Sequence, residues 1–147
     1  MPSFLKPLTS LIIPPLWQTI NNNIKWDIQY TEAFLVPIPL SRKKLKERGF
    51  NQAQEIAKEL SLSLKIPLLS DVLLKIKETS AQVELQGKDR QENIKGVFVC
   101  QKPDLIKSKK IILIDDVFTT GATMEECARV LKTAGAKEVW GVTVARG

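Results

Sequence analysis

The clearest hydrophobic pattern lies in the last third of the chain. Residues 111–114 are an apolar run without alternation, which is typical of a parallel strand covered on both faces. A helix is predicted over residues 122–133, and residues 139–145 supply the next strand. Strand, helix and strand in succession form a βαβ unit, whose strands lie parallel and whose crossover is right-handed. The inner face of the helix is predicted to carry Met124, Cys127, Ala128 and Leu131, and Gly135 is placed to end it.

An earlier strand and a second helix are predicted upstream. Residues 33–38 form a short apolar run, which indicates a buried strand that ends in a Pro-x-Pro sequence. Asn51 is the predicted N-cap of a helix that begins directly after it. The inner face of that helix is predicted to carry Ala53, Ile56, Ala57 and Leu60, which follow helical spacing.

Shorter elements lie between these two parts. One short strand is predicted within residues 65–74 and another at residues 97–99. Residues 75–95 are polar and follow no clean period, and a loop of this length inside a small domain is often a functional lid. Together the elements predict a single α/β domain over residues 1–147, with a twisted, mainly parallel sheet and helices on both faces.

The amino-acid composition excludes several kinds of catalytic and metal-binding site. The 147 residues contain no histidine, which removes histidine triads, histidine general bases and histidine metal sites. The two cysteines form no CxxC pair, so neither a zinc ribbon nor a disulfide-stapled secreted domain is predicted. A net charge of +6 favours contact with phosphates, either on metabolites or on nucleic acid. Any catalysis must therefore use carboxylates, hydroxyls, backbone amides, Lys, Arg or a bound metal.

The beginning of the chain shows neither a signal peptide nor a membrane span. Pro14 and Pro15 interrupt the only apolar stretch there, residues 11–16. No apolar run in the sequence reaches the length of about 18 residues that a membrane-spanning helix needs. We therefore expect a cytoplasmic protein without membrane insertion.

Two acids and a threonine-rich turn mark the strongest candidate site. Asp115 and Asp116 follow the buried strand, and ligands of open α/β sheets bind beyond the carboxyl ends of the strands. Such a pair, facing a crevice, would hydrogen-bond the hydroxyls of a ribose or hold a metal, although the alternative is that it merely caps a helix. The turn offers N–H groups, hydroxyls and a favourable helix dipole to a phosphate. Its residues are Thr119, Thr120, Gly121, Ala122 and Thr123, without the Lys of a Walker A loop.

A cationic segment follows the first strand. Residues 41–49 are predicted to form a basic loop, for which a solvated surface and contact with pyrophosphate are two interpretations. A third is single-stranded DNA binding, which normally needs exposed aromatic rings beside the cations. Phe50 is the only close ring, and burial would remove it from such a role. The cations are Arg42, Lys43, Lys44, Lys46 and Arg48.

Four segments together resemble a known family. Residues 113–123, Leu-Ile-Asp-Asp-Val-Phe-Thr-Thr-Gly-Ala-Thr, resemble the motif by which type I phosphoribosyltransferases bind the pyrophosphate ester of ribose 5-phosphate (PRPP). More narrowly, residues 36–40 resemble the first core strand and pyrophosphate loop of the ComF family. The resemblance covers residues 33–147 as the core of the fold. Its most specific signature is Arg48, Gly49, Phe50, Asn51 and Gln52, and a flexible-loop pattern matches at Thr79, Gln82, Arg90, Asn93, Gly96 and Phe98.

The resemblance implies a role for each segment. Asp115 and Asp116 are the implied catalytic acids, which hold the ribose hydroxyls with the aid of Mg²⁺. Residues 119–123 would cradle the 5-phosphate of PRPP. The remaining implied contacts are Leu40, Ser41 and Arg42 near the pyrophosphate, and Gln82, Arg90 and Asn93 in a lid over residues 77–93.

The resemblance also implies a function and partners. Many ComF proteins begin with a four-cysteine zinc-binding module, which this chain lacks, and residues 1–32 are expected to form an incomplete N-terminal segment, or hood. The implied activity is a pentosyl glycosyltransferase that moves ribosyl phosphate from PRPP to an unknown acceptor, in a family linked to DNA uptake and competence. A non-catalytic PRPP sensor and a single-stranded DNA-binding accessory protein are the alternatives. The implied partners are single-stranded DNA, a competence helicase and a second copy of the chain.

Overall fold

The computed structural model describes residues 33–78, 94–118 and 121–146, and its centre is a three-stranded parallel sheet. The strand β4 (Lys110–Phe118) lies between β1 (Ala33–Pro37) and β5 (Glu138–Arg146). Both neighbours pair with β4 in the parallel sense, so the carboxyl ends of all three strands meet at one edge. We call this the carboxyl edge. The predicted βαβ unit is confirmed.

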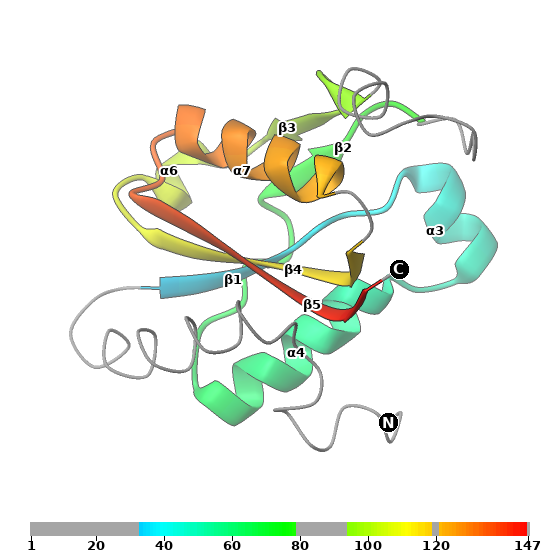
Figure 1. Ribbon diagram of the computed structural model, residues 1–147, viewed down its shortest axis with the longest axis horizontal. Helices are drawn as coiled ribbons and strands as arrows, with labels where there is room; N and C mark the ends of the chain where they lie inside the picture. The colour runs from blue at the N-terminus through cyan, green and yellow to red at the C-terminus, as the bar shows by residue number, and fades with distance from the viewer. Residues whose placement is uncertain (1–32, 79–93, 119–120, 147) are drawn as a thin grey trace.

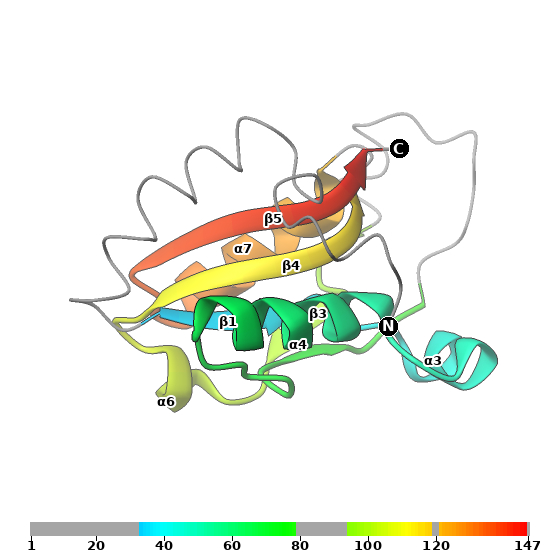
Figure 2. The ribbon, with the colours of Figure 1, turned by 90° about the horizontal axis from the view of Figure 1, so that it is seen from below.

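Two helices cover opposite faces of this sheet (Figures 1 and 2). α4 (Gln52–Leu64) packs on one face and α7 (Ala122–Thr133) on the other. Successive residues of β4 point to opposite faces, which is why its sequence is apolar without alternation. No helix in the described part of the chain has the length and apolar character to cross a membrane. Ile112 and Ile114 join Ile56, Ala57 and Leu60 of α4, whereas Ile111 and Leu113 join Cys127 and Leu131 of α7.

Two further strands form a separate antiparallel pair beside α7. β2 (Leu73–Lys75) pairs with β3 (Phe98–Cys100), and Lys75 lies opposite Phe98. β2 lies at the end of the predicted range 65–74 and continues one residue beyond it, and β3 begins one residue later than predicted, because short strands leave few positions from which a period can be read. The short helix α6 (Pro103–Ile106) then leads into β4.

The segment predicted as a basic loop is instead a helix, α3 (Arg42–Arg48). Ser41 is buried and begins the helix by accepting a hydrogen bond from the Lys44 N–H at 3.2 Å. Gly49 ends it in the left-handed conformation (φ 81°), with its N–H donating to the Leu45 carbonyl. No residue of α3 is buried, and the helix projects from the body of the molecule in Figure 2. The sequence did not predict this helix because hydrophobic periodicity identifies a helix by its apolar face, and α3 has none.

Candidate functional site

Asp115 and Asp116 lie within β4 rather than beyond it. The strand was expected to end near residue 114, but pairing with β5 continues through Asp115, opposite Thr143, as far as Phe118. On the other side β1 has already ended, and the Ile38 N–H donates to the Ile114 carbonyl at 2.9 Å. The two acids therefore lie at the carboxyl edge, held by β5 and adjacent to the end of β1.

The two acids influence each other strongly. The backbone N–H of Asp116 donates to Oδ1 of Asp115 at 2.8 Å. Burial, followed by the hydrogen bond and negative charge of the Asp116 side chain, raises the pKa of Asp115 to about 7. Near neutral pH the pair therefore retains a proton for part of the time, and an approaching cation would favour its ionised form. A perturbed acid pair at this edge indicates a ligand site more strongly than a simple helix cap.

The acid pair also fits a magnesium ion that arrives with phosphate. Mg²⁺ keeps several waters and is usually held by one or two carboxylates together with the phosphate oxygens of a substrate. Within residues 33–78, 94–118 and 121–146, no three His, Cys, Asp or Glu side chains converge as a metal cage would require. Asp115 and Asp116 would be the oxygen ligands of such an ion.

The N-terminus of α7 follows the acids along the chain. Gly121 precedes the helix in the left-handed conformation (φ 82°), which glycine adopts without strain. Gly121 and Ala122 are buried and Thr123 is half-buried, at the end of the helix where the dipole favours an anion. Thr119 and Thr120 lie outside the described residues, so the structure places the last three residues of the predicted phosphate cradle.

The predicted pyrophosphate loop and the ComF signature line one cavity of about 510 Å³, here called the signature pocket. Asn51 anchors it, because its side chain accepts from the Ala53 N–H (3.0 Å) to cap α4 and donates to the Ile38 carbonyl (3.1 Å). Phe50 is 49% exposed, so the burial considered above does not occur. Ser41 lies in the α3 cap and Gln52 begins α4. The predicted site residues that line the pocket are Leu40, Arg42, Gly49, Phe50 and Asn51.

The predicted lid is described only at its flanks. Gln82, Arg90, Asn93 and Thr79 lie outside the described residues. Phe98 is buried in β3, and Gly96 adopts a left-handed conformation (φ 74°) just before that strand.

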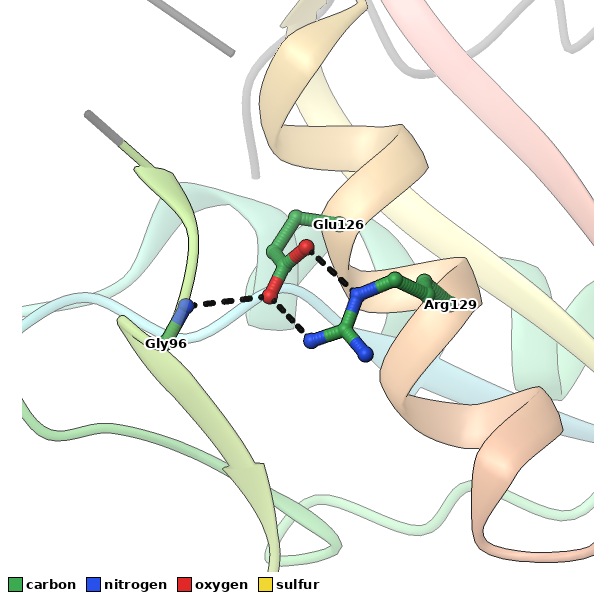
Figure 3. A network of polar contacts seen from close by, with 3 residues as sticks. All are labelled: Gly96, Glu126 and Arg129. Atoms are coloured by element: carbon green, nitrogen blue, oxygen red, sulfur yellow. Dashed lines mark hydrogen bonds and ion pairs between the residues drawn. The ribbon is translucent and has the colours of Figure 1, made fainter. Parts of the chain in front are cut away.

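Glu126 is a buried polar residue near the site that the sequence did not single out. Its carboxylate on α7 is 5% exposed and accepts hydrogen bonds from Nε (2.9 Å) and Nη2 (2.7 Å) of Arg129 (Figure 3). The same carboxylate accepts from the Gly96 N–H at 3.2 Å. The Arg129 guanidinium holds the pKa of Glu126 below its usual value, so the pair stays charged at neutral pH. Glu126 thereby connects the turn before β3 to α7 by hydrogen bonds. The only feature of the sequence that could have indicated this residue is its position three residues before Arg129.

The fold and this edge define the class of protein. The family described as "Phosphoribosyl transferase domain" matches residues 16–147, and the chain belongs to this family. A solved hypoxanthine phosphoribosyltransferase from Staphylococcus aureus superposes with a TM-score of 0.53 at 16% identity, over 90% of this chain and 64% of that one. The predicted type I phosphoribosyltransferase-like fold is confirmed.

Curated relatives narrow the class further. Competence protein F of Haemophilus influenzae is 35% identical over 111 residues, which are 74% of this chain and 48% of the relative. Competence protein ComFC of Streptococcus pneumoniae is 36% identical over 116 residues, which are 76% of this chain and 47% of the relative. The chain spans about half the length of the curated relatives it matches. The resemblance to the ComF family is confirmed.

Proposed function

We propose that this chain binds PRPP with Mg²⁺ at the carboxyl edge and transfers its ribosyl phosphate to a nitrogen nucleophile. The observation that carries the proposal is the half-buried pair Asp115 and Asp116 at the carboxyl edge, in which the raised pKa of Asp115 favours a cation or hydroxyl donors as a ligand. These carboxylates would hold the ribose hydroxyls and the ion. Residues 121–123 at the start of α7 would receive the 5-phosphate, and Leu40 to Arg42 would lie near the pyrophosphate.

The proposed reaction displaces pyrophosphate from C1 of the ribose. The nitrogen lone pair of the acceptor forms the new bond to C1 as the C1–O bond breaks, and that electron pair leaves with the pyrophosphate. The nitrogen then releases its proton to solvent. Positive charge develops on the ribose in the transition state, and Asp115 and Asp116, fixed beside the ring hydroxyls, would stabilise it electrostatically. When bound, Mg²⁺ neutralises part of the negative charge on the departing pyrophosphate.

Calorimetric titration of the purified chain with PRPP, with and without Mg²⁺, tests this proposal. We expect micromolar-range binding that requires Mg²⁺. Pyrophosphate release in the presence of candidate nitrogen acceptors then separates an enzyme from a sensor, because only transfer or hydrolysis liberates it. A folded wild type that does not bind PRPP would contradict the proposal.

The affinity for PRPP and Mg²⁺ should rise with pH up to a plateau above the pKa of Asp115, which lies at about 7. Below that pKa the carboxyl group is protonated in the free protein, so binding must expel a proton and should weaken up to about tenfold per pH unit. Calorimetry between pH 5.5 and 8.5 measures this profile. The variant Asp115→Asn is the control. Its affinity for PRPP should change with pH only through titration of the phosphate groups of the ligand. A profile identical in both proteins would argue against an ionised Asp115 in the complex.

One observation favours a second function, the binding of single-stranded DNA. Phe50 is 49% exposed and follows α3, whose five cations lie on a helix without a buried residue. Stacking of bases on an aromatic ring beside a cationic track is the usual arrangement in proteins that bind single strands. This surface lies on the signature pocket and is built from residues other than the acid pair.

The variant Phe50→Ala should therefore bind a single-stranded oligonucleotide about 5- to 100-fold more weakly, the loss expected for one stacked base. Fluorescence anisotropy with a labelled oligothymidine, repeated at several salt concentrations, measures it. Leu62→Ala on α4 is the matched control, because Leu62 is 77% exposed and lies near the end of α4 that is farther along the helix from Phe50. DNA binding that is absent in the wild type, or equal in both variants, would rule out this second function.

A further inference from the structure

The hydroxyl group of Thr143 on β5 is buried without a hydrogen-bond partner. The residue is 0% exposed. Among the residues that the structure describes, its Oγ1 is the one buried side-chain oxygen or nitrogen that makes no hydrogen bond. An unpaired buried hydroxyl costs folding free energy, because the group loses its bonds to water and gains none in return. Such groups are rare in folded proteins, so this one needs a physical explanation.

Thr143 is the register partner of Asp115. The two residues lie opposite each other in the parallel ladder that joins β5 to β4. Neighbouring strands of a sheet are about 4.8 Å apart, so a hydroxyl and a carboxylate on two such partners can come within hydrogen-bonding distance if both point to the same face.

Both side chains point to the face of the sheet that α7 covers. On β4, Leu113 packs into the core beneath α7, and Asp115 follows it by two residues. On β5, a Cβ added at Gly141 would lie 3.0 Å from Sδ of Met124 on α7, and Thr143 follows Gly141 by two residues. Because successive side chains of a strand alternate between its faces, Thr143 and Asp115 are neighbours on the α7 face.

The Asp115 carboxylate is a suitable acceptor for this hydroxyl. An ionised carboxylate offers about four lone-pair positions, and Oδ1 of Asp115 accepts from the Asp116 N–H at 2.8 Å. A ligand at the carboxyl edge approaches the carboxylate from outside the sheet, whereas Thr143 approaches it from the neighbouring strand. A threonine hydroxyl changes direction by rotation about one side-chain bond, and its bond to a charged acceptor is about twice as strong as a neutral one.

We propose that Thr143 is a positioning residue of the proposed PRPP site, whose hydroxyl donates a hydrogen bond to the Asp115 carboxylate when that carboxylate holds the ligand. This inference rests on the proposed function. The bond gives Thr143 the partner that it lacks within the protein, so its free energy adds to the affinity for the ligand. It also fixes the orientation of the carboxylate, while the buried Thr143 itself does not touch the ligand. The sequence did not single out Thr143, because threonine is common in strands.

Variants that differ by a hydroxyl alone test this role. Thr143→Val keeps the shape of the side chain. In calorimetry at pH 8 it should bind PRPP with Mg²⁺ about 10- to 100-fold more weakly, the loss expected for a hydrogen bond to a charged group. Its melting temperature should rise by at least about 2 °C, because the unpaired hydroxyl is removed. Thr143→Ser retains the hydroxyl and should bind within about threefold of the wild type. Thr133→Val, at an exposed position at the other end of α7, is the control and should change neither quantity.

A double-mutant cycle identifies the group through which Thr143 acts. In the Asp115→Asn background, Thr143→Val should change the affinity by less than about threefold, because the charged acceptor has already been removed. A residue with a purely structural role would instead lower the melting temperature and the affinity together, and by the same factor in both backgrounds.

The outcomes separate this inference from the proposed function. A wild type that binds no PRPP overturns both. A wild type that binds PRPP overturns this inference alone if Thr143→Val binds equally well, or if its loss is unchanged in the Asp115→Asn background. If Thr143→Val does not fold, Thr143→Ser and Thr143→Ala provide the same comparison, because they also differ by the hydroxyl alone. Tighter binding by Thr143→Ser would support the inference, and equal affinity of these two variants would overturn it.

Discussion

The double variant Asp115→Asn/Asp116→Asn should bind PRPP at least about 100-fold more weakly than the wild type. Each substitution replaces a charged acceptor of hydrogen bonds from the ribose hydroxyls, and both remove charge from the proposed position of Mg²⁺. Calorimetry at pH 8 measures the loss, where Asp115 with its pKa of about 7 is mostly ionised in the wild type. Asp104→Asn on α6, which precedes β4 at the opposite edge, is the control and should bind normally. Retained affinity in the double variant would place PRPP elsewhere.

The loss of affinity should not come from unfolding. The pKa of Asp115 is raised in the folded protein, from 3.8 to about 7, so the folded state binds more protons than the unfolded state between these values. The contribution of this group to the free energy of unfolding therefore falls as the pH rises through that window and stays low above it. The variant Asp115→Asn should accordingly melt at a higher temperature than the wild type at pH 8. This difference in melting temperature should be smaller at pH 4. A ligand site is an expected place for such a conflict between stability and binding.

The variant Leu113→Ala should reduce the free energy of unfolding by about 2–5 kcal/mol. Leu113 lies on β4 and is fully buried against α7. Its truncation therefore leaves a cavity in the core, two residues before Asp115 on the same strand. For a chain of this size the melting temperature should fall by about 5–15 °C, measured by circular dichroism or calorimetry.

The same substitution at Leu62 provides the matched control. Leu62 is 77% exposed on α4, so Leu62→Ala should change the free energy of unfolding by less than about 0.5 kcal/mol. Equal losses for the two variants would contradict the two-layer core in which β4 is covered by α7 on one face and α4 on the other.

The parts of the fold that the sequence predicted well are those with long, uniform patterns. The helix over residues 122–133 has the predicted bounds, because its apolar spacing and the following glycine are local signals. The Asn51 cap and the buried face of α4 are confirmed for the same reason. The candidate acids were also evident, since two carboxylates after an apolar run are unusual wherever the strand ends.

Other features depend on contacts between distant segments. β4 continues past Asp115 only because β5 pairs with it, and no local pattern carries that information. α3 contains a single apolar residue, Leu45, so no hydrophobic period marked it in the sequence, although its serine and glycine caps are local. The role of Glu126 depends on Gly96, which lies 30 residues earlier in the chain. The extension of β4 and the role of Glu126 each required a distant partner that the sequence does not identify.

The sequence by itself therefore determined the α/β class, the βαβ unit and the identity of the acids, because hydrophobic periodicity, capping residues and paired charges are local properties. The tertiary structure decided which charges meet. It raised the pKa of Asp115 by burying it, exposed Phe50 beside α3, and brought the Glu126 carboxylate to the N–H of Gly96. Burial and electrostatic coupling depend on distances through space, and these exist only once the chain has folded.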